Sequence, residues 1–258
     1  MQVEYLSVLS SNLALLGFIG GWFTAALNAV GVVPVLLISR VSQKLQDSGL
    51  SFGAGVMLAA AFTSLIIPGF EGYGPFPVLI GIALGGLVLG LTDRILPQMH
   101  FVIGREGLRT ERLRGIWLFV IAITLHNIPE GLAVGVVFGS GDIARGLSLM
   151  TAIGIQNIPE GLAVGFSLLA TGLYTRHQSY FAGVVSGLVE PPMALIGAWA
   201  VTLFHSALPY AMGFAAGAMI FVISDEIIPE THKQGSERSS TFALIMGLII
   251  MLVLDSLL

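Results

Sequence analysis

The sequence predicts an all-α polytopic membrane protein with eight transmembrane helices. Its 258 residues are 55% hydrophobic and only 10% charged, whereas roughly 25% charged residues is typical of soluble domains. The mean hydropathy is +0.91, and the apolar residues form segments of about 20 residues or more, the length that crosses a bilayer as a helix. The 33 glycines suit helices that pack closely in lipid. Disulfides and thiolate ligands are excluded because the chain has no cysteine.

Eight apolar segments define the predicted helices, which we assign to a single transmembrane domain covering residues 1–258. The first segment lacks a preceding basic region, so we interpret it as a spanning helix and not as a cleaved signal. Its length leaves room for a tilt, or for a kink near Gly31 and Pro34. A longer cytoplasmic loop is expected at 97–114. The helices are expected at 8–38, 50–70, 76–96, 115–139, 146–173, 179–204, 207–230 and 240–258.

The basic residues indicate the orientation, because cytoplasmic loops of membrane proteins are enriched in lysine and arginine. If the amino terminus is outside, only Arg145 falls in an outer loop. We therefore predict that both termini lie on the outer side. The basic residues that then fall in inner loops are Arg40, Lys44, Arg94, Arg105, Arg109, Arg112, Arg114, Arg176, Lys233 and Arg238.

One stretch of the chain occurs twice. Residues 124–136 read TLHNIPEGLAVGV and residues 154–166 read GIQNIPEGLAVGF, with nine identical residues in a row. Residues three and four apart share one face of an α-helix, so each copy gathers an imidazole or amide, a second amide and a carboxylate. These polar residues are His126, Asn127 and Glu130 in the first copy, and Gln156, Asn157 and Glu160 in the second.

Each copy places a carboxylate beside a proline inside an apolar helix. Pro129 has no N–H, which frees the carbonyl of Leu125. An acidic residue at mid-bilayer costs roughly 3 kcal/mol when it stays charged and unpaired. Because every lysine and arginine is assigned to a loop, Glu130, Glu160 and Glu190 require a bound cation, protonation or a water-filled cavity. Opposed carboxylates can hold or bridge divalent cations, so we predict an intramembrane metal site.

A weaker repeat suggests an inverted architecture. Residues 53–57 (GAGVM) resemble residues 215–219 (AAGAM), and each is followed by Ile-Ile-Pro, ending at Pro68 and Pro229 one residue out of register. In the predicted topology these two helices run in opposite directions, as do the two motif helices. Many secondary transporters build their substrate site from such repeats. The alternative is chance similarity between helices rich in glycine and alanine.

At these residues the chain resembles the ZIP (Zrt/Irt-like) family of divalent metal transporters, in particular its bacterial GufA-like branch. The features that match are HNIPEG in the fourth helix, QNIPEG in the fifth, Glu-Pro in the sixth, eight spans and outer termini. The resemblance implies a 3+2+3 arrangement in which the first three and last three helices are pseudosymmetric, with a binuclear site between the fourth and fifth. It also implies a homodimer in the bacterial inner membrane.

The resemblance assigns roles to residues of this sequence. Where many members have a histidine and an acid, this chain has the neutral Gln156 and Asn157, which weakens the second metal position. The first position would use His126, Glu130, Gln156 and Glu160 with Met57, and the second would use Asn127, Glu130, Asn157, Glu160 and Glu190. The transport pathway would include Ser64, Glu71 and Asp255 at the entrance, and Asp93, Asp225 and Glu226 towards release. Glu230 lies at the same end of the seventh predicted helix as Asp225 and Glu226, and this end is either an exit vestibule that attracts cations or an ordinary solvated helix end.

We therefore expect a permease, not an enzyme, that moves Zn²⁺, or else Cd²⁺, Fe²⁺ or Mn²⁺, into the cytoplasm by alternating access. Imidazole and carboxylate ligands suit Zn²⁺ without excluding other first-row metals, and no organic cofactor or nucleic acid is expected. One alternative is an intramembrane metal-dependent hydrolase whose metal activates water, although an HExxH signature is absent. Another is a proton-coupled carrier with Glu130, Glu160 and Glu190 as the relay.

Overall fold

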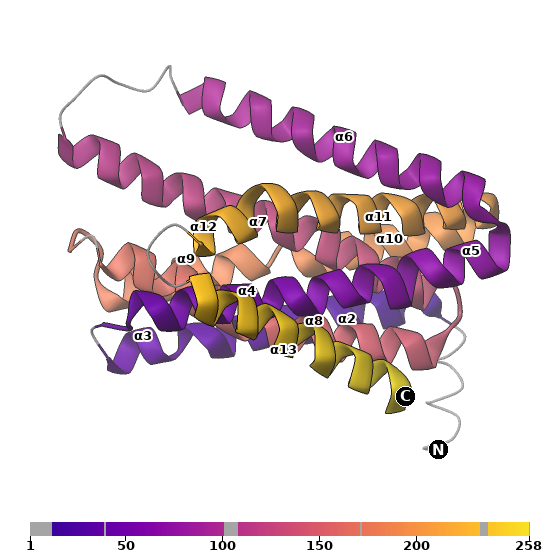
Figure 1. The fold of residues 1–258 in the computed structure, drawn as a ribbon, viewed down its shortest axis with the longest axis horizontal. Helices are drawn as coiled ribbons and strands as arrows, with labels where there is room; N and C mark the ends of the chain where they lie inside the picture. Colours follow the sequence, from indigo (N-terminus) through magenta and orange to yellow (C-terminus); the bar gives the residue numbers. More distant parts are fainter. Residues whose placement is uncertain (1–11, 39, 101–107, 171, 233–236, 258) are drawn as a thin grey trace.

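The computed structural model describes residues 12–38, 40–100, 108–170, 172–232 and 237–257, with side chains described outside 92–123 and 205. The regular structure in these ranges is helical throughout, which confirms the all-α prediction. Figure 1 shows the helices lying along one another in an elongated bundle. They are α2 (Leu13–Val32), α3 (Pro34–Leu37), α4 (Gln43–Ala60), η1 (Ala61–Ile66), α5 (Ile67–Tyr73), α6 (Pro75–His100), α7 (Leu108–Gly139), α8 (Ile143–Leu169), α9 (Arg176–Gly187), α10 (Glu190–Leu203), η2 (His205–Ala207), α11 (Leu208–Val222), η3 (Ile223–Ile227), α12 (Ile228–Thr231) and α13 (Glu237–Leu257).

The second predicted helix begins earlier than residue 50. Helix α4 begins at Gln43, where the Ser42 hydroxyl accepts a hydrogen bond from the Leu45 amide at 3.3 Å. One turn later, the Gln43 side chain donates to Asp47 Oδ1 at 2.8 Å. The polar residues that made this stretch resemble a loop therefore cap the helix and form its first turns.

The predicted cytoplasmic loop at 97–114 is also shorter than expected. Helix α6 continues to His100 and α7 already begins at Leu108. The residues between them lie outside the described ranges. Hydropathy predicts where an apolar span ends, whereas a helix can extend past that point into polar sequence, and this explains both differences.

The sixth predicted helix is interrupted in its middle. Helix α9 ends at Gly187 and α10 begins at Glu190. Pro191 and Pro192 have no N–H to donate to the carbonyls of Gly187 and Leu188, so a continuous helix would lose two hydrogen bonds here. The first predicted helix is divided in a similar way at Val33, between α2 and α3, in the region where a kink was expected.

Both members of the weaker repeat contain a π-helical segment. Segment η1 begins four residues after Met57, and η3 begins four residues after Met219. Segment η1 has six residues and η3 has five, so the difference of one residue between the repeats lies inside these segments. Each ends just before an Ile-Pro pair, and π-helical turns of this kind occur frequently at functional sites.

The helices form two groups. Helices α2, α7, α8, α9 and α10 pack on one another, and we call them the site group. In the second group, helix α13 packs along α4, and α6 packs along α11. We call these four helices, together with η1, η3, α5 and α12, the support group. The two groups meet where α4 lies on α8 and α11 lies on α7. The contact between the groups therefore runs along the two motif helices.

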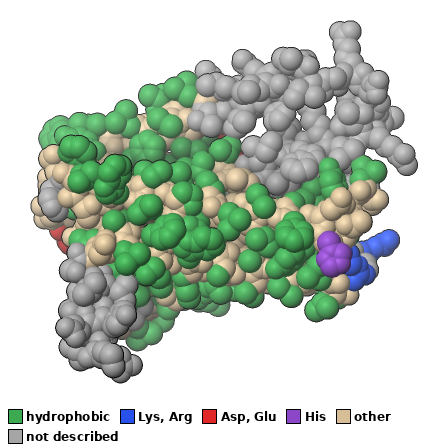
Figure 2. Space-filling view, turned by 180° about the vertical axis from the view of Figure 1, so that it is seen from behind, with side chains coloured by type: hydrophobic (Ala, Val, Ile, Leu, Met, Phe, Trp, Pro, Cys, Tyr) green, Lys and Arg blue, Asp and Glu red, His purple; other side chains and the backbone are tan. Residues whose placement is uncertain are grey.

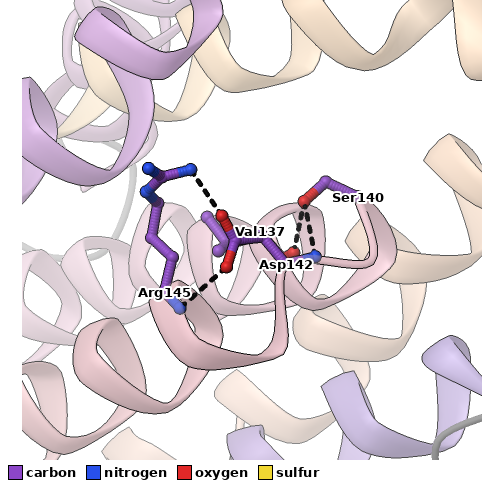
Figure 3. A network of polar contacts seen from close by, with 4 residues as sticks. All are labelled: Val137, Ser140, Asp142 and Arg145. Atoms are coloured by element: carbon purple, nitrogen blue, oxygen red, sulfur yellow. Dashed lines mark hydrogen bonds and ion pairs between the residues drawn. The ribbon is translucent and has the colours of Figure 1, made fainter. Parts of the chain in front are cut away.

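A short turn fixes α7 and α8 as an antiparallel hairpin (Figure 3). Asp142 caps α8 by accepting from the Arg145 amide at 3.0 Å, and it pairs with the Arg145 guanidinium at 2.6 Å. The Ser140 hydroxyl donates to the Val137 carbonyl at 2.7 Å at the end of α7. Gly141 has a φ of +89°, a conformation that glycine adopts without the strain of a side chain.

The surface between the two ends of the bundle is largely apolar. Figure 2 shows hydrophobic side chains spread over this region, with basic side chains at one end. Large residues such as Trp22, Trp199 and Phe242 are 50%, 59% and 69% exposed. Five helical stretches of the described chain are long and apolar enough to cross a membrane: Leu13–Leu37, Gln43–Tyr73, Arg176–Leu203, Leu208–Thr231 and Glu237–Leu257. The protein is therefore an integral membrane protein.

Candidate metal site

The two copies of the repeated motif lie on α7 and α8, each with its proline inside the helix. The motif glycines are points of close approach to other helices. A Cβ added at Gly131 would lie 2.7 Å from the Glu190 carbonyl oxygen, and one added at Gly161 would lie 2.3 Å from the Asn28 carbonyl oxygen. The NIPEG sequence therefore docks α7 against α10 and α8 against α2, because only glycine allows this separation.

The predicted metal ligands are buried together in the site group and the adjoining face of α4. His126 is 4% exposed, so even the most accessible of them is nearly sealed from the surface. The other buried members are Met57, Asn127, Glu130, Gln156, Asn157, Glu160 and Glu190, each 0% or 1% exposed. Such deep burial of polar groups requires partners of the opposite hydrogen-bonding type.

The amide groups of the site use their N–H donors on neighbouring acceptors. Gln156 Nε2 donates to Glu130 Oε1 at 2.7 Å. Asn157 Nδ2 donates to Glu190 Oε1 at 2.8 Å and lies 3.3 Å from the Thr24 carbonyl oxygen. Asn127 Nδ2 donates to the Ser186 carbonyl at 2.9 Å. These bonds turn the amide oxygens away from the bonded acceptors and leave them available.

The result is a cluster of buried oxygens with no hydrogen-bond donor among the described residues. Amide and carboxylate oxygens can both accept from N–H groups or ligate a cation. An unsatisfied buried acceptor costs about 1–3 kcal/mol, and more when it is charged. These oxygens therefore lack a hydrogen-bond partner among the described residues. Its members are Asn127 Oδ1, Glu130 Oε2, Gln156 Oε1, Asn157 Oδ1, both oxygens of Glu160, and Glu190 Oε2.

If the carboxylates of this cluster are ionised, their charge has no fixed counterion among the described residues. The Glu130 carboxylate lies within electrostatic range of both Glu160 and Glu190. The buried polar residues of the described chain include no lysine or arginine. Three carboxylates that repel one another in a region of low dielectric are stable as charged groups only with a cation between them.

Two contacts link the site to the support group. His126 Nε2 lies 2.8 Å from Glu226 Oε2, and the two side chains are 5% and 22% exposed. A Cβ added at Gly53 of α4 would lie 3.5 Å from Glu160 Oε1, so this carboxylate faces the backbone of α4. Met57 is one turn further along the same helix. The sequence placed Glu226 on the release route but did not predict its contact with His126.

The carboxylates and the histidine do not form a metal site by themselves. In the ranges that the structure describes, no group of three or more histidine, aspartate or glutamate side chains is arranged to hold a metal ion. His126 contacts Glu226 rather than Glu130, and two of the residues between the carboxylates are the amides Gln156 and Asn157. A cation here would need amide oxygens as ligands.

The predicted pathway residues lie outside this cluster. Ser64 in η1 is buried, and its hydroxyl has no hydrogen-bond partner among the described residues. The Asp93 side chain lies outside the described residues. The remaining pathway residues reach the surface to differing degrees: Glu71, Asp225 and Glu230 are exposed, and Glu226 and Asp255 are partly buried.

Two polar residues of α2 also border the site and were not predicted. Thr24 and Asn28 are both 0% exposed, and they lie one turn apart on the same helix face. The Thr24 carbonyl faces Asn157, and Asn28 packs on Gly161. The available signal was the spacing of Gly17, Gly20 and Gly21 before them, which marks this face of α2 as a close packing surface.

Comparison with known proteins identifies the family of this chain. Residues 104–255 match the family model described as ZIP Zinc transporter. The chain belongs to the ZIP family. Among its relatives is Zinc transporter ZIPB of Bordetella bronchiseptica, which is 43% identical over 251 residues, covering 92% of this chain and 80% of the relative. The family prediction made from the two motifs is therefore confirmed.

Two other ZIP relatives align with this chain over nearly all of their own length. Zinc transporter GufA of Myxococcus xanthus is 39% identical over 248 residues, covering 93% of this chain and 97% of the relative. Zinc transporter ZIP11 of Homo sapiens is 32% identical over 327 residues, covering 92% of this chain and 95% of the relative. The predicted GufA-like branch is confirmed, and membership of a ZIP transporter family agrees with a transporter rather than with the alternative hydrolase.

Proposed function

We propose that this ZIP protein is a permease that moves a divalent transition metal, with Zn²⁺ as the preferred substrate, into the cytoplasm. The observation that carries the proposal is the buried cluster of seven acceptor oxygens that lacks both donors and a counterion among the described residues. A divalent cation would supply the missing positive charge and could be coordinated by several of these oxygens at once. The names of the relatives support zinc as the metal.

The ligand sets in the proposal are those implied by the family resemblance. One cation is held by His126, Glu130, Gln156 and Glu160 with Met57, and a second by Asn127, Glu130, Asn157, Glu160 and Glu190. The second position is the weaker one, because Asn157 supplies no charge there. Cd²⁺, Fe²⁺ and Mn²⁺ are further candidate substrates, since affinity order alone does not set selectivity among these metals.

The site group is proposed to move against the support group, giving the metal access to one side of the membrane at a time. Support comes from the division of the helices into two groups and from the His126–Glu226 contact that joins them. A movement of α7 along η3 would break this contact. The eight spans, the 3+2+3 pseudosymmetry, outer termini, the bacterial inner membrane and a homodimer belong to the same proposal.

The test is metal uptake into proteoliposomes that contain a metal-sensitive dye, with wild type beside Glu130→Ala. Zn²⁺, Cd²⁺, Fe²⁺ and Mn²⁺ are supplied in turn. Glu237→Ala is the matched control, because Glu237 is an exposed acid at the start of α13. We expect uptake to be lost in Glu130→Ala and retained in Glu237→Ala. Uptake by Glu130→Ala at the wild-type rate would show that the metal passes elsewhere.

A further inference from the structure

Asn28 is a fully buried polar residue of α2 that belongs to neither proposed ligand set. Its Nδ2 donates to the Gly183 carbonyl at 2.7 Å, and its Oδ1 has no donor among the described residues. The side chain lies between two glycines. A Cβ added at Gly161 would lie 2.9 Å from Asn28 Oδ1, and one added at Gly187 would lie 2.6 Å from Asn28 Nδ2. Asn28 therefore contacts α8 and α9 together.

The carbonyl that Asn28 binds lies in the last turn of α9, just before the helix is interrupted. The Ser186 hydroxyl also donates to this Gly183 oxygen, at 2.8 Å. In the same turn, the Ser186 carbonyl accepts from Asn127 at 2.9 Å. Two asparagines, one from α2 and one from α7, thus anchor the end of α9 from different sides. The Ser186 carbonyl lies in the last turn of α9, where carbonyls have no helical donor and accept from side chains instead.

The interruption determines where Glu190 lies. Glu190 begins α10 only three residues after Gly187, and its carboxylate accepts from Asn157. A rotation or shift of the last turn of α9 would therefore carry Glu190 away from Asn157. The segment between the two helices has fewer regular hydrogen bonds than a continuous helix, so side chains that bind its flanks determine its position.

The packing of the motif glycines gives Asn28 a counterpart. Gly131 of α7 packs on Glu190, and Gly161 of α8 packs on Asn28. One turn later, Gly135 packs on Ala194 and Gly165 packs on Val32 and Val35. Helices α2 and α10 thus approach their motif helices in the same way. Asn28 of α2 therefore lies beside Gly161 of the second motif in the same way that Glu190 of α10 lies beside Gly131 of the first motif.

We propose that Asn28 is a positioning residue of the metal site, which holds the end of α9 so that Glu190 stays beside Asn157. This inference rests on the proposed function as a metal permease. Asn28 acts through Glu190 and is not itself a ligand. Substitution of the residues that orient metal ligands lowers metal affinity by about 10- to 100-fold, so the loss of Asn28 is expected to weaken binding at the position that uses Glu190.

The test is Zn²⁺ binding to the purified full-length chain in lipid nanodiscs by titration calorimetry, with thermal unfolding of the metal-free protein to verify folding. Asn28→Ala removes the amide. Asn12→Ala is the control, because Asn12 is an exposed residue whose side chain caps the far end of the same helix, accepting from the Leu15 amide at 3.1 Å. Asn28→Ser is the second variant, since its hydroxyl is too short to span the distance to Gly183.

We expect Asn28→Ala and Asn28→Ser to lower Zn²⁺ affinity about tenfold, and Asn12→Ala to leave it unchanged. In a Glu190→Gln background, Asn28→Ala should cause less than about a twofold further loss, because residues that act through one another are not additive. Wild-type affinity in Asn28→Ala, an equal loss in both backgrounds, or unfolding of both Asn28 variants would overturn the proposal. Wild type that binds no Zn²⁺ would overturn the proposed function itself.

Discussion

A methyl group at Gly161 should separate α2 from α8 and disturb the proposed metal site. In Gly161→Ala the new Cβ would lie 2.3 Å from the Asn28 carbonyl oxygen, about 1 Å closer than ordinary van der Waals contact. The nearest atom is backbone, so the contact is relieved only by moving one helix. Overpacking of this kind costs about 1–3 kcal/mol, and alanine returns up to about 1 kcal/mol through its higher helix propensity.

The expected loss of unfolding free energy is therefore modest, roughly 0–3 kcal/mol. The effect on transport should be larger, because metal ligands must stay within about 0.2 Å of their ideal distances. A shift of about 1 Å between α8 and α2 moves Glu160 relative to the other ligands. We expect the Zn²⁺ concentration for half-maximal uptake to rise by at least about tenfold, measured in proteoliposomes together with thermal unfolding of the purified protein.

Gly86→Ala provides the matched control. It adds the same methyl group to helix α6, but its Cβ would lie 4.0 Å from the nearest neighbouring atom, the Gly217 carbonyl oxygen. Uptake by this variant should equal that of wild type. A folded Gly161→Ala protein with wild-type Zn²⁺ dependence would refute the conclusion that the motif glycine sets the geometry of the site.

The other predictions concern the neutral residue of the second metal position and the buried methionine. Asn157→Asp places a second carboxylate against Glu190 at the 2.8 Å contact, so the metal-free protein should unfold at a lower temperature while Zn²⁺ raises its stability more than that of wild type. Thermal unfolding with and without Zn²⁺ measures this, and equal metal stabilisation in both proteins would contradict it. Met57→Ala and Met219→Ala each remove a methionine that is 0% exposed, so both should lose about 2–5 kcal/mol of stability. Only Met57→Ala should also lose Cd²⁺ affinity in calorimetry, and equal Cd²⁺ binding by the two variants would remove Met57 from the ligand set.

The sequence was sufficient to predict the residues that are buried together at the site. His126 and Glu130 share one face of α7, and Gln156 and Glu160 share one face of α8, because helical spacing places each pair together. The membrane character and the helical fold follow from composition and segment length. These features depend on residues that are close in the chain, which is why they could be predicted without an alignment.

Features that depend on contacts between distant segments were not predictable. The contact of His126 with Glu226 joins residues 100 positions apart, and that of Asn28 with Gly183 joins residues 155 apart. The interruption between α9 and α10 had a local cause in Pro191 and Pro192, but proline inside a membrane helix often causes only a kink. The hydrogen bonds of Asn28 and Asn127 to the flanking carbonyls join distant segments, so the sequence did not show them.

The two π-helical segments, η1 and η3, carry chemically different residues at equivalent positions. Ser64 lies seven residues after Met57, and Glu226 lies seven residues after Met219. One segment thus presents a hydroxyl and the other a carboxylate that contacts His126. In the proposed permease, a cation near η3 would meet a carboxylate, whereas one near η1 would meet a hydroxyl. The first would hold it far more strongly, because a carboxylate attracts a divalent cation more than a hydroxyl does.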